Sequence, residues 1–145
     1  MSWESSIKGF KSYLQIERSL SDNSVQAYIR DIKKFANYAI PLKLNELKIQ
    51  RENISDFLAE LKDDGIAARS QARIISGIKA FYKYLIIEDY IKYDPTELIE
   101  SPKVGFKLPN TLSLIEIDKL ISAVDLSNKQ GERNRAILET LYSCG

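Results

Sequence analysis

The residues with the clearest chemical potential are the positively charged side chains of residues 65–87. At about 100° per residue, an α-helix over this segment places its four cations within an arc of roughly 120°. The members of this basic arc are Arg69, Arg73, Lys79 and Lys83. No Asp or Glu occurs in the segment, and the small residues Ala72, Ser76 and Ala80 lie between the cations. A surface of this kind favours close contact with the phosphates of a nucleic acid.

The opposite side of the same helix is apolar and is expected to face a protein core. It carries Ile74, Ile75, Ile78, Phe81, Tyr82, Leu85 and Ile86. A simpler interpretation is that the cations only keep one face of an amphipathic helix solvated. The absence of acids in the segment favours the nucleic-acid interpretation over this one.

Composition restricts the chemistry that the chain can perform. The 145 residues are 44% hydrophobic and 28% charged, as in a globular protein, and the formal net charge is only +1. DNA binding would therefore depend on local clusters of cations. With no His and one cysteine, Cys144, the sequence offers neither a disulfide framework nor a cysteine-based zinc site. We expect a cytoplasmic protein without a metal and, because no window approaches 18 consecutive apolar residues, without a membrane span.

Hydrophobic periodicity predicts an all-α chain, since no alternating strand pattern is longer than a few residues. Helices are expected over residues 3–16, from a cap at Ser21 to Ala39, over about 52–64 and over 65–87. Pro41 would close the second helix, and Gly65 would end the third in a left-handed conformation. The segment Asp94-Pro-Thr-Glu97 combines an N-cap, a first-turn proline and a glutamate, and predicts a short fifth helix over 95–99.

The sequence changes character after residue 100. Residues 101–110 contain two prolines, a glycine and two lysines but no acid, which predicts an extended linker. Beyond them, Ser113 and Glu116 form a capping box that begins a helix to about residue 124, and a last helix is expected over about 131–142. Two such helices can hardly enclose a core, so we expect the chain to stop inside a domain.

Five segments in register resemble the tyrosine recombinases of the Xer type and their integrase relatives. They are residues 20–35 (LSDNSVQAYIRDIKKF), residues 65–73 with 81–85, Asp94-Pro95 with Ser101-Pro-Lys103, residues 108–113 (LPNTLS) and residues 133–145. Each segment alone is a weak signal. Their common order and spacing across nearly the whole chain make the resemblance specific.

The resemblance implies a division of the chain into three parts. A four- to five-helix core-binding domain over residues 1–100 would bind DNA, residues 101–111 would form the linker, and residues 112–145 would begin a catalytic domain. The implied partners are a double-stranded DNA recombination site and further recombinase subunits, which form a tetramer on DNA in the whole protein. No metal or nucleotide cofactor is implied.

In this family the second and fourth helices of the core-binding domain lie across the major groove. The residues that match them, extended along the basic arc, are Ser24, Gln26, Arg30, Lys33, Arg69, Ser70, Arg73, Ser76, Lys79 and Lys83. Arg30 and Arg73 are suited to guanine edges. The lysines are better suited to phosphates.

Catalysis in the family needs a tyrosine nucleophile that forms a 3′-phosphotyrosine link, together with arginines, a lysine and histidines. The first of those arginines is expected after Gly145, and none of the eight tyrosines has the surroundings of a nucleophile. We therefore predict no catalytic residue in this chain, which should bind DNA without cutting it. The whole protein would be a recombinase of the type that resolves chromosome dimers, with a role in chromosome partition and cell division.

Two alternatives stay open. One is a phage or transposon integrase, although the lack of an arm-binding segment before Trp3 favours the resolvase type. The other is a helical protein-interaction module in which the basic arc meets an acidic partner.

Overall fold

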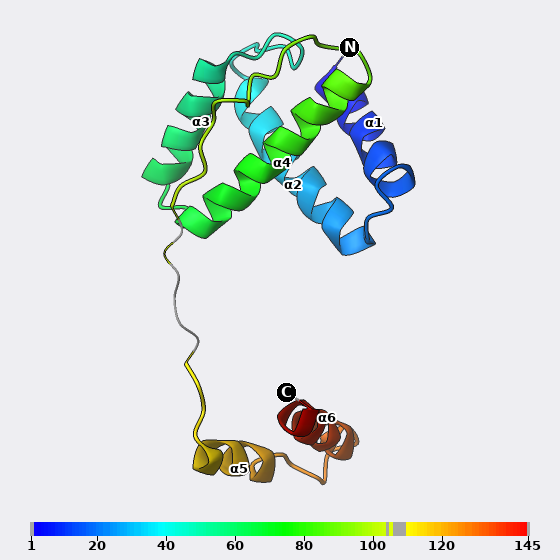
Figure 1. Ribbon diagram of the computed structural model, residues 1–145, viewed down its shortest axis with the longest axis vertical. Coiled ribbons are helices and arrows are strands. Elements are labelled where there is room, and N and C mark those ends of the chain that lie inside the picture. Colours follow the sequence, from blue (N-terminus) through cyan, green and yellow to red (C-terminus); the bar gives the residue numbers. More distant parts are fainter. Residues whose placement is uncertain (1, 104, 106–109, 145) are drawn as a thin grey trace. The chain divides into compact units, whose positions relative to one another are not determined.

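In the computed structural model, the regular elements of the described residues, which are 2–103, 105 and 110–144, are all helices. The chain divides into two compact units, Met1–Gly105 and Phe106–Gly145. The first contains α1 (Trp3–Ile16), α2 (Asp22–Ala39), α3 (Arg51–Asp63) and α4 (Ala68–Ile87), and the second contains α5 (Leu114–Ser122) and α6 (Gly131–Cys144) (Figure 1). The all-α prediction is confirmed. Part of the predicted linker, residue 104 and residues 106–109, and Gly145 lie outside the described residues.

The first unit is organised around α4, which packs against each of its other three helices. Figure 1 shows α4 crossing α2, with α3 and α1 on either side. The buried residues of α4 are Ile74, Ile75, Gly77, Ile78, Phe81, Tyr82, Tyr84 and Leu85. The predicted apolar face is therefore confirmed, except that Tyr84 joins it and Ile86 is only partly buried.

Aromatic side chains fill the space among α1, α2 and α4. The ring of Phe81 lies edge-on to Phe10, with 5.4 Å between centroids, and stacks against Trp3 at 6.0 Å. Trp3 in turn meets Phe35 edge-on at 5.6 Å. Such pairs contribute about 0.5–1.5 kcal/mol each beyond their burial. They join the three helices into one core.

Most helix ends follow the local signals of the sequence. The Ser21 hydroxyl accepts a hydrogen bond from the Ser24 backbone N–H at the start of α2. Gly65 has φ 73° just after α3, and the capping box of Ser113 and Glu116 begins α5. The basic helix begins at Ala68, three residues after the predicted start at Gly65.

The predicted fifth helix over residues 95–99 is wrong, because this segment forms turns. Asp94 does behave as a cap: its Oδ1 accepts hydrogen bonds from the backbone N–H and the hydroxyl of Thr96 at 2.8 and 2.6 Å. Five residues are too few to sustain a helix in isolation. The buried side chain of Ile99, 6% exposed, anchors the segment on the core instead. The described part of the first unit is a four-helix bundle.

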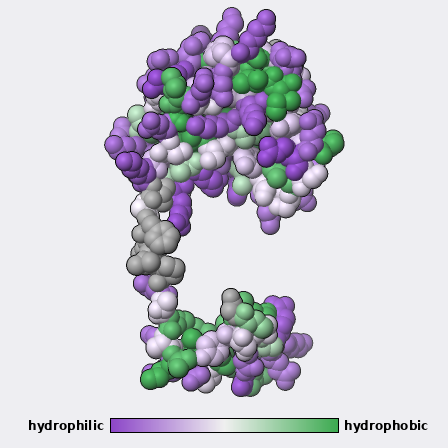
Figure 2. All heavy atoms as spheres, in the orientation of Figure 1, coloured by the Kyte–Doolittle hydropathy of each residue, from purple (hydrophilic) through white to green (hydrophobic). Residues whose placement is uncertain are grey.

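The second unit buries little of its apolar surface. The side chains of Ile137 and Leu141 are 47% and 65% exposed, and Gly131 is the buried residue of α6. Figure 2 shows hydrophobic residues spread over the surface of this unit. Two short helices thus do not enclose a core of their own, as the sequence indicated.

The crossing of α2 and α4 is unusually close at Gly77. A Cβ atom at this position would lie 2.8 Å from Cβ of Asp31 on α2, nearer than two such carbons can approach. The absence of a side chain at Gly77 therefore sets the distance between the two helices.

Replacing Gly77 by Ala should lower the free energy of unfolding by about 1–3 kcal/mol, because α2 and α4 must move apart. The higher helix propensity of Ala recovers only part of this loss. Urea unfolding followed by far-ultraviolet circular dichroism measures the change. The matched control is Ser76→Ala on the exposed side of α4, which should stay within about 0.5 kcal/mol of the parent. A Gly77→Ala midpoint equal to that of the parent would contradict the packing argument.

Candidate nucleic-acid interface

The N-terminal ends of α2 and α4 both lie along the lower edge of the first unit in Figure 1, at opposite corners of that edge on the two sides of the helix crossing. The first turns of these helices contain Ser24 on α2 and Arg69 and Ser70 on α4. Helix N-termini carry a partial positive charge and free backbone N–H groups, so this edge suits anions such as phosphates. Arg69 is exposed there, whereas Ser24 and Ser70 are half-buried.

An ion pair joins the two helices one to two turns further on. The Nη1 atom of Arg73 on α4 donates to both carboxylate oxygens of Asp31 on α2, at 2.6 Å each. Asp31 is only 4% exposed, while the side chain of Arg73 is 52% exposed. Asp31 therefore holds Arg73 through Nη1, while about half of the Arg73 side chain remains exposed to solvent.

Three cations surround the carboxylate of Asp31. Burial raises the pKa of this carboxyl group above its usual value, and the positive charges of Arg73, Arg30 and Lys34 offset part of that rise. Arg30 and Lys34 are both exposed. With three cations to one anion, the cluster remains positive and can still attract phosphates.

Asp31 and Lys34 are functional candidates that the sequence reasoning missed. A helical wheel of α4 shows no acid, but the acid that meets Arg73 comes from the neighbouring helix. The sequence signal that could have identified Asp31 is its position four residues before the buried Phe35, which places both residues on the same side of α2. The proposed contact of Arg73 with guanine stays a prediction, with one of its nitrogens already engaged by Asp31.

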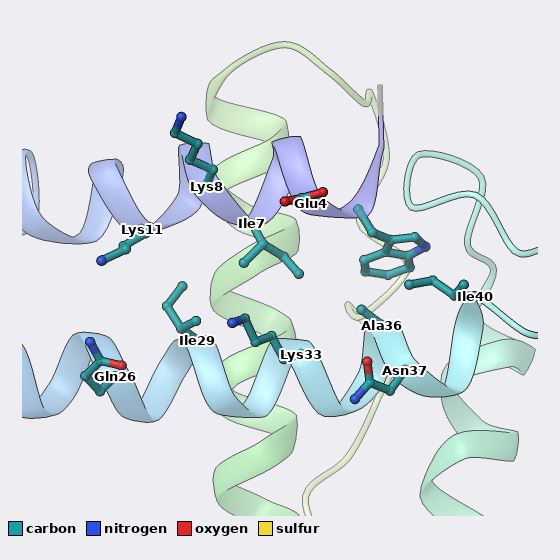
Figure 3. Close-up of a pocket in the computed structure, with 11 residues that line it drawn as sticks. Glu4, Ile7, Lys8, Lys11, Gln26, Ile29, Lys33, Ala36, Asn37 and Ile40 are labelled. Atoms are coloured by element: carbon teal, nitrogen blue, oxygen red, sulfur yellow. The ribbon is translucent and has the colours of Figure 1, made fainter.

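Gln26 and Lys33 lie apart from this cluster, in a groove of about 630 Å³ between α1 and α2. Figure 3 shows both on α2, opposite Lys8 and Lys11 of α1, with Ile7 and Ile29 between them. The groove thus has an apolar floor, and its rims carry several lysines together with Glu4 of α1. The structure does not bring Gln26 and Lys33 together with Arg73.

Lys79 and Lys83 line a smaller pocket, of about 150 Å³, together with Arg18 and Tyr28. Among the described residues of the first unit, these three cations form no ion pair. Arg18, in the turn after α1, could not be found from the periodicity of α4. A positive pocket of this size suits a phosphate group.

Two of the predicted serine hydroxyls, those of Ser76 and Ser24, already have hydrogen-bond partners nearby in the sequence. Ser76 Oγ donates to the carbonyl oxygen of Ala72 at 2.9 Å, within its own helix. Ser24 Oγ likewise lies 3.1 Å from Ser21 Oγ at the cap of α2.

In the described part of the chain, no cluster of His, Cys, Asp or Glu is arranged to hold a metal ion. None of the described helices has the length and hydropathy to cross a membrane.

The ion pair predicts an asymmetry between its two partners. Arg73→Gln leaves a carboxylate buried without its cation, which costs about 3–5 kcal/mol in a fully buried pair. Because Arg73 is half-exposed and its charge is screened by water, we expect a loss of about 2 kcal/mol. Asp31→Asn leaves only a solvated guanidinium group and should cost less than about 1 kcal/mol. Chemical unfolding of both variants measures the difference.

The pH dependence gives a second check on the same variants. Without Arg73, the pKa of Asp31 rises further, and the folded state then favours the protonated carboxyl more than the unfolded state does. The stability of Arg73→Gln, relative to the parent, should be highest at acid pH, where Asp31 is protonated, and should fall as the pH rises through the pKa of Asp31. A pH-independent difference between Arg73→Gln and the parent would contradict this account.

Comparison with known proteins places this geometry in a family. A family model described as the phage integrase N-terminal SAM-like domain matches residues 7–89. A tyrosine recombinase XerD from Staphylococcus haemolyticus is 41% identical over 143 residues, which are 98% of this chain and 48% of the relative. A tyrosine recombinase XerD from Staphylococcus epidermidis is 39% identical over 140 residues, 96% of this chain and 48% of the relative.

A solved structure shares the fold. The integrase from mycobacterium phage Brujita matches with a TM-score of 0.62 and 20% identity, covering 82% of this chain and 39% of the other. The chain spans about half the length of the recombinases that it matches. It belongs to the phage-integrase family, and residues 7–89 form the N-terminal SAM-like domain of that family.

Proposed function

We propose that the first unit is the DNA-binding portion of a site-specific tyrosine recombinase and that it holds duplex DNA against the N-terminal ends of α2 and α4. The observation that carries the proposal is a set of exposed cations on these two helices: Arg69 in the first turn of α4, Arg73 one turn further along, and Arg30 on α2 next to Asp31, with which Arg73 pairs. Duplex DNA is the partner that fits best, because an α-helix enters its major groove and cations at the rim meet its phosphates. The relatives named XerD support the same assignment.

The proposed contacts divide by chemistry. Arg30 and Arg73, which flank the crossing of α2 and α4, are placed to reach base edges, and a bidentate contact with guanine discriminates by about 1–3 kcal/mol. Arg69 and the pocket of Arg18, Lys79 and Lys83 would hold phosphates and add affinity that depends on salt. Gln26 and Lys33 face the groove toward α1 and belong at most to the margin of this interface.

We further propose the domain organisation that the family resemblance implies. Residues 1–100 form the core-binding domain, residues 101–111 the linker, and residues 112–145 the start of a catalytic domain. In the whole protein, further subunits would assemble as a tetramer on a recombination site in the cytoplasm. That protein would cut and rejoin DNA through a 3′-phosphotyrosine link to resolve chromosome dimers.

The residues described here are proposed to bind DNA without cutting it. The chain contains no His, and two of its tyrosines form hydrogen bonds that support the fold. Tyr82 is 1% exposed, and burial raises the pKa of its hydroxyl, which donates to the carbonyl oxygen of Glu46 at 3.3 Å. Tyr93 donates to the carbonyl oxygen of Ile49 at 2.9 Å. Neither phenol is prepared to attack a phosphate.

The DNA-binding proposal is tested with a fluorescently labelled duplex and anisotropy over a range of salt concentrations. Arg30→Gln/Arg69→Gln removes two exposed cations that have no ion pair among the described residues, so the fold should persist. We expect about tenfold weaker binding at low salt, and a plot of log affinity against log salt that is shallower by about 2. The charge-matched control Lys48→Gln/Lys92→Gln, with both lysines exposed in loops outside α2 and α4, should bind like the parent. Equal affinities for the two double variants would refute the proposed interface.

The small positive pocket has its own test. Arg18→Gln/Lys79→Gln/Lys83→Gln should weaken binding to unrelated duplexes by a similar factor, because phosphates carry no sequence information. The same salt titration should show a slope shallower by up to about 3. If the triple variant keeps the slope of the parent, the pocket does not hold phosphate.

A further inference from the structure

Asp31 is an unexpected residue at a surface that binds DNA. A carboxylate repels phosphates, and this one sits where the two proposed DNA-facing helices cross. Among the described residues of the first unit, the pair of Asp31 and Arg73 is the one ion pair present. Its place at the crossing of the two DNA-facing helices indicates a role connected with Arg73.

The pair leaves Arg73 with one defined set of donors. A guanidinium group has five N–H bonds, one on Nε and two on each Nη atom. Asp31 engages Nη1, which lies on the same side of the group as the Cδ atom. Asp31 therefore takes up part of the fork made by Nη1 and Nη2. The fork made by Nε and Nη2 is not engaged by Asp31, and bidentate recognition needs two such parallel bonds.

The position of Asp31 is itself fixed by packing. Its Cβ lies where a side chain at residue 77 would collide with it, so α4 presses directly on it. The residue is also buried, at 4% exposure. Arg73 thus loses much of its rotational freedom when the protein folds rather than when it binds DNA.

We propose that Asp31 is a positioning residue that determines specificity: it holds Nη1 of Arg73 so that the guanidinium group presents its Nε and Nη2 donors to one base edge. This inference rests on the proposed DNA-binding function. Asp31 lowers the general attraction for DNA and raises the selectivity of Arg73. On the general affinity for DNA, the effect of Asp31 is therefore opposite to that of an exposed cation on the same surface.

The test uses the full chain and two single variants. Duplexes are selected from a random-sequence library by the parent protein, and the best duplex and a scrambled one are then titrated by anisotropy. Asp31→Asn should bind the scrambled duplex more tightly than the parent, with a salt slope steeper by up to about 1. Its ratio of selected to scrambled affinity should fall by about tenfold.

Arg73→Lys separates positioning from charge. It keeps a cation beside Asp31 but has no planar fork, so the affinity ratio should fall as in Asp31→Asn while binding to the scrambled duplex does not tighten. The double variant Asp31→Asn/Arg73→Lys should lose no further selectivity, since both changes remove the same contact. A library reselected with Asp31→Asn should also lose its preference at the base pair that depends on Arg73.

Three other results would overturn the inference, and each has a different meaning. An Asp31→Asn protein that keeps the affinity ratio of the parent shows that Asp31 does not position Arg73 for reading DNA. Equal weakening on both duplexes shows that Asp31 only supports the fold. Parent protein that binds neither duplex at low salt refutes the proposed function itself, together with the inference that rests on it.

Discussion

The close approach of α4 to α2 at Gly77 is the constraint on which the rest of the first unit depends. It brings the backbone of α4 against Asp31, which places Arg73 within reach of that carboxylate and leaves Arg30 and Lys34 beside it. The same crossing directs the N-terminal ends of both helices to one edge (Figure 1). The aromatic contacts of Trp3, Phe10 and Phe81 then fix α1 against the same helix pair. Core packing and surface charge are therefore set by one helix pair.

The charge distribution explains how a nearly neutral chain can present a positive surface. The acids of α3, such as Glu52, Asp56 and Glu60, lie on a helix flanking α4 and do not pair with its arginines. Burial raises the pKa of Asp31 above its usual value despite the cations around it. Buried ion pairs of this kind often add little net stability to a fold. Local sorting of charge, rather than net charge, gives the edge of α2 and α4 its affinity for anions.

Sequence periodicity was sufficient for the helices, because each depends on residues within a few turns of one another. The span Trp3–Ile16 and the left-handed Gly65 were predicted from local patterns alone. The helix predicted after Asp94 was wrong. Asp94 does cap the segment, but the segment forms turns and Ile99 is buried in the core. The pairing of Asp31 with Arg73 and the approach of Arg18 to Lys83 join residues far apart in the chain. No single-helix pattern contains such information, so the candidate site could be predicted only as a list of cationic and polar residues, without their partners.

The buried carboxylate at the helix crossing also limits how this surface can change over evolutionary time. An arginine that reads DNA on an open surface can be exchanged one mutation at a time. Arg73 cannot, because any neutral successor strands the charge of Asp31 inside the bundle. A lineage that acquires a new target sequence through this position must therefore alter both residues together or pass through a less stable ancestor. Compensated substitutions at the two positions would be the trace of such a shift.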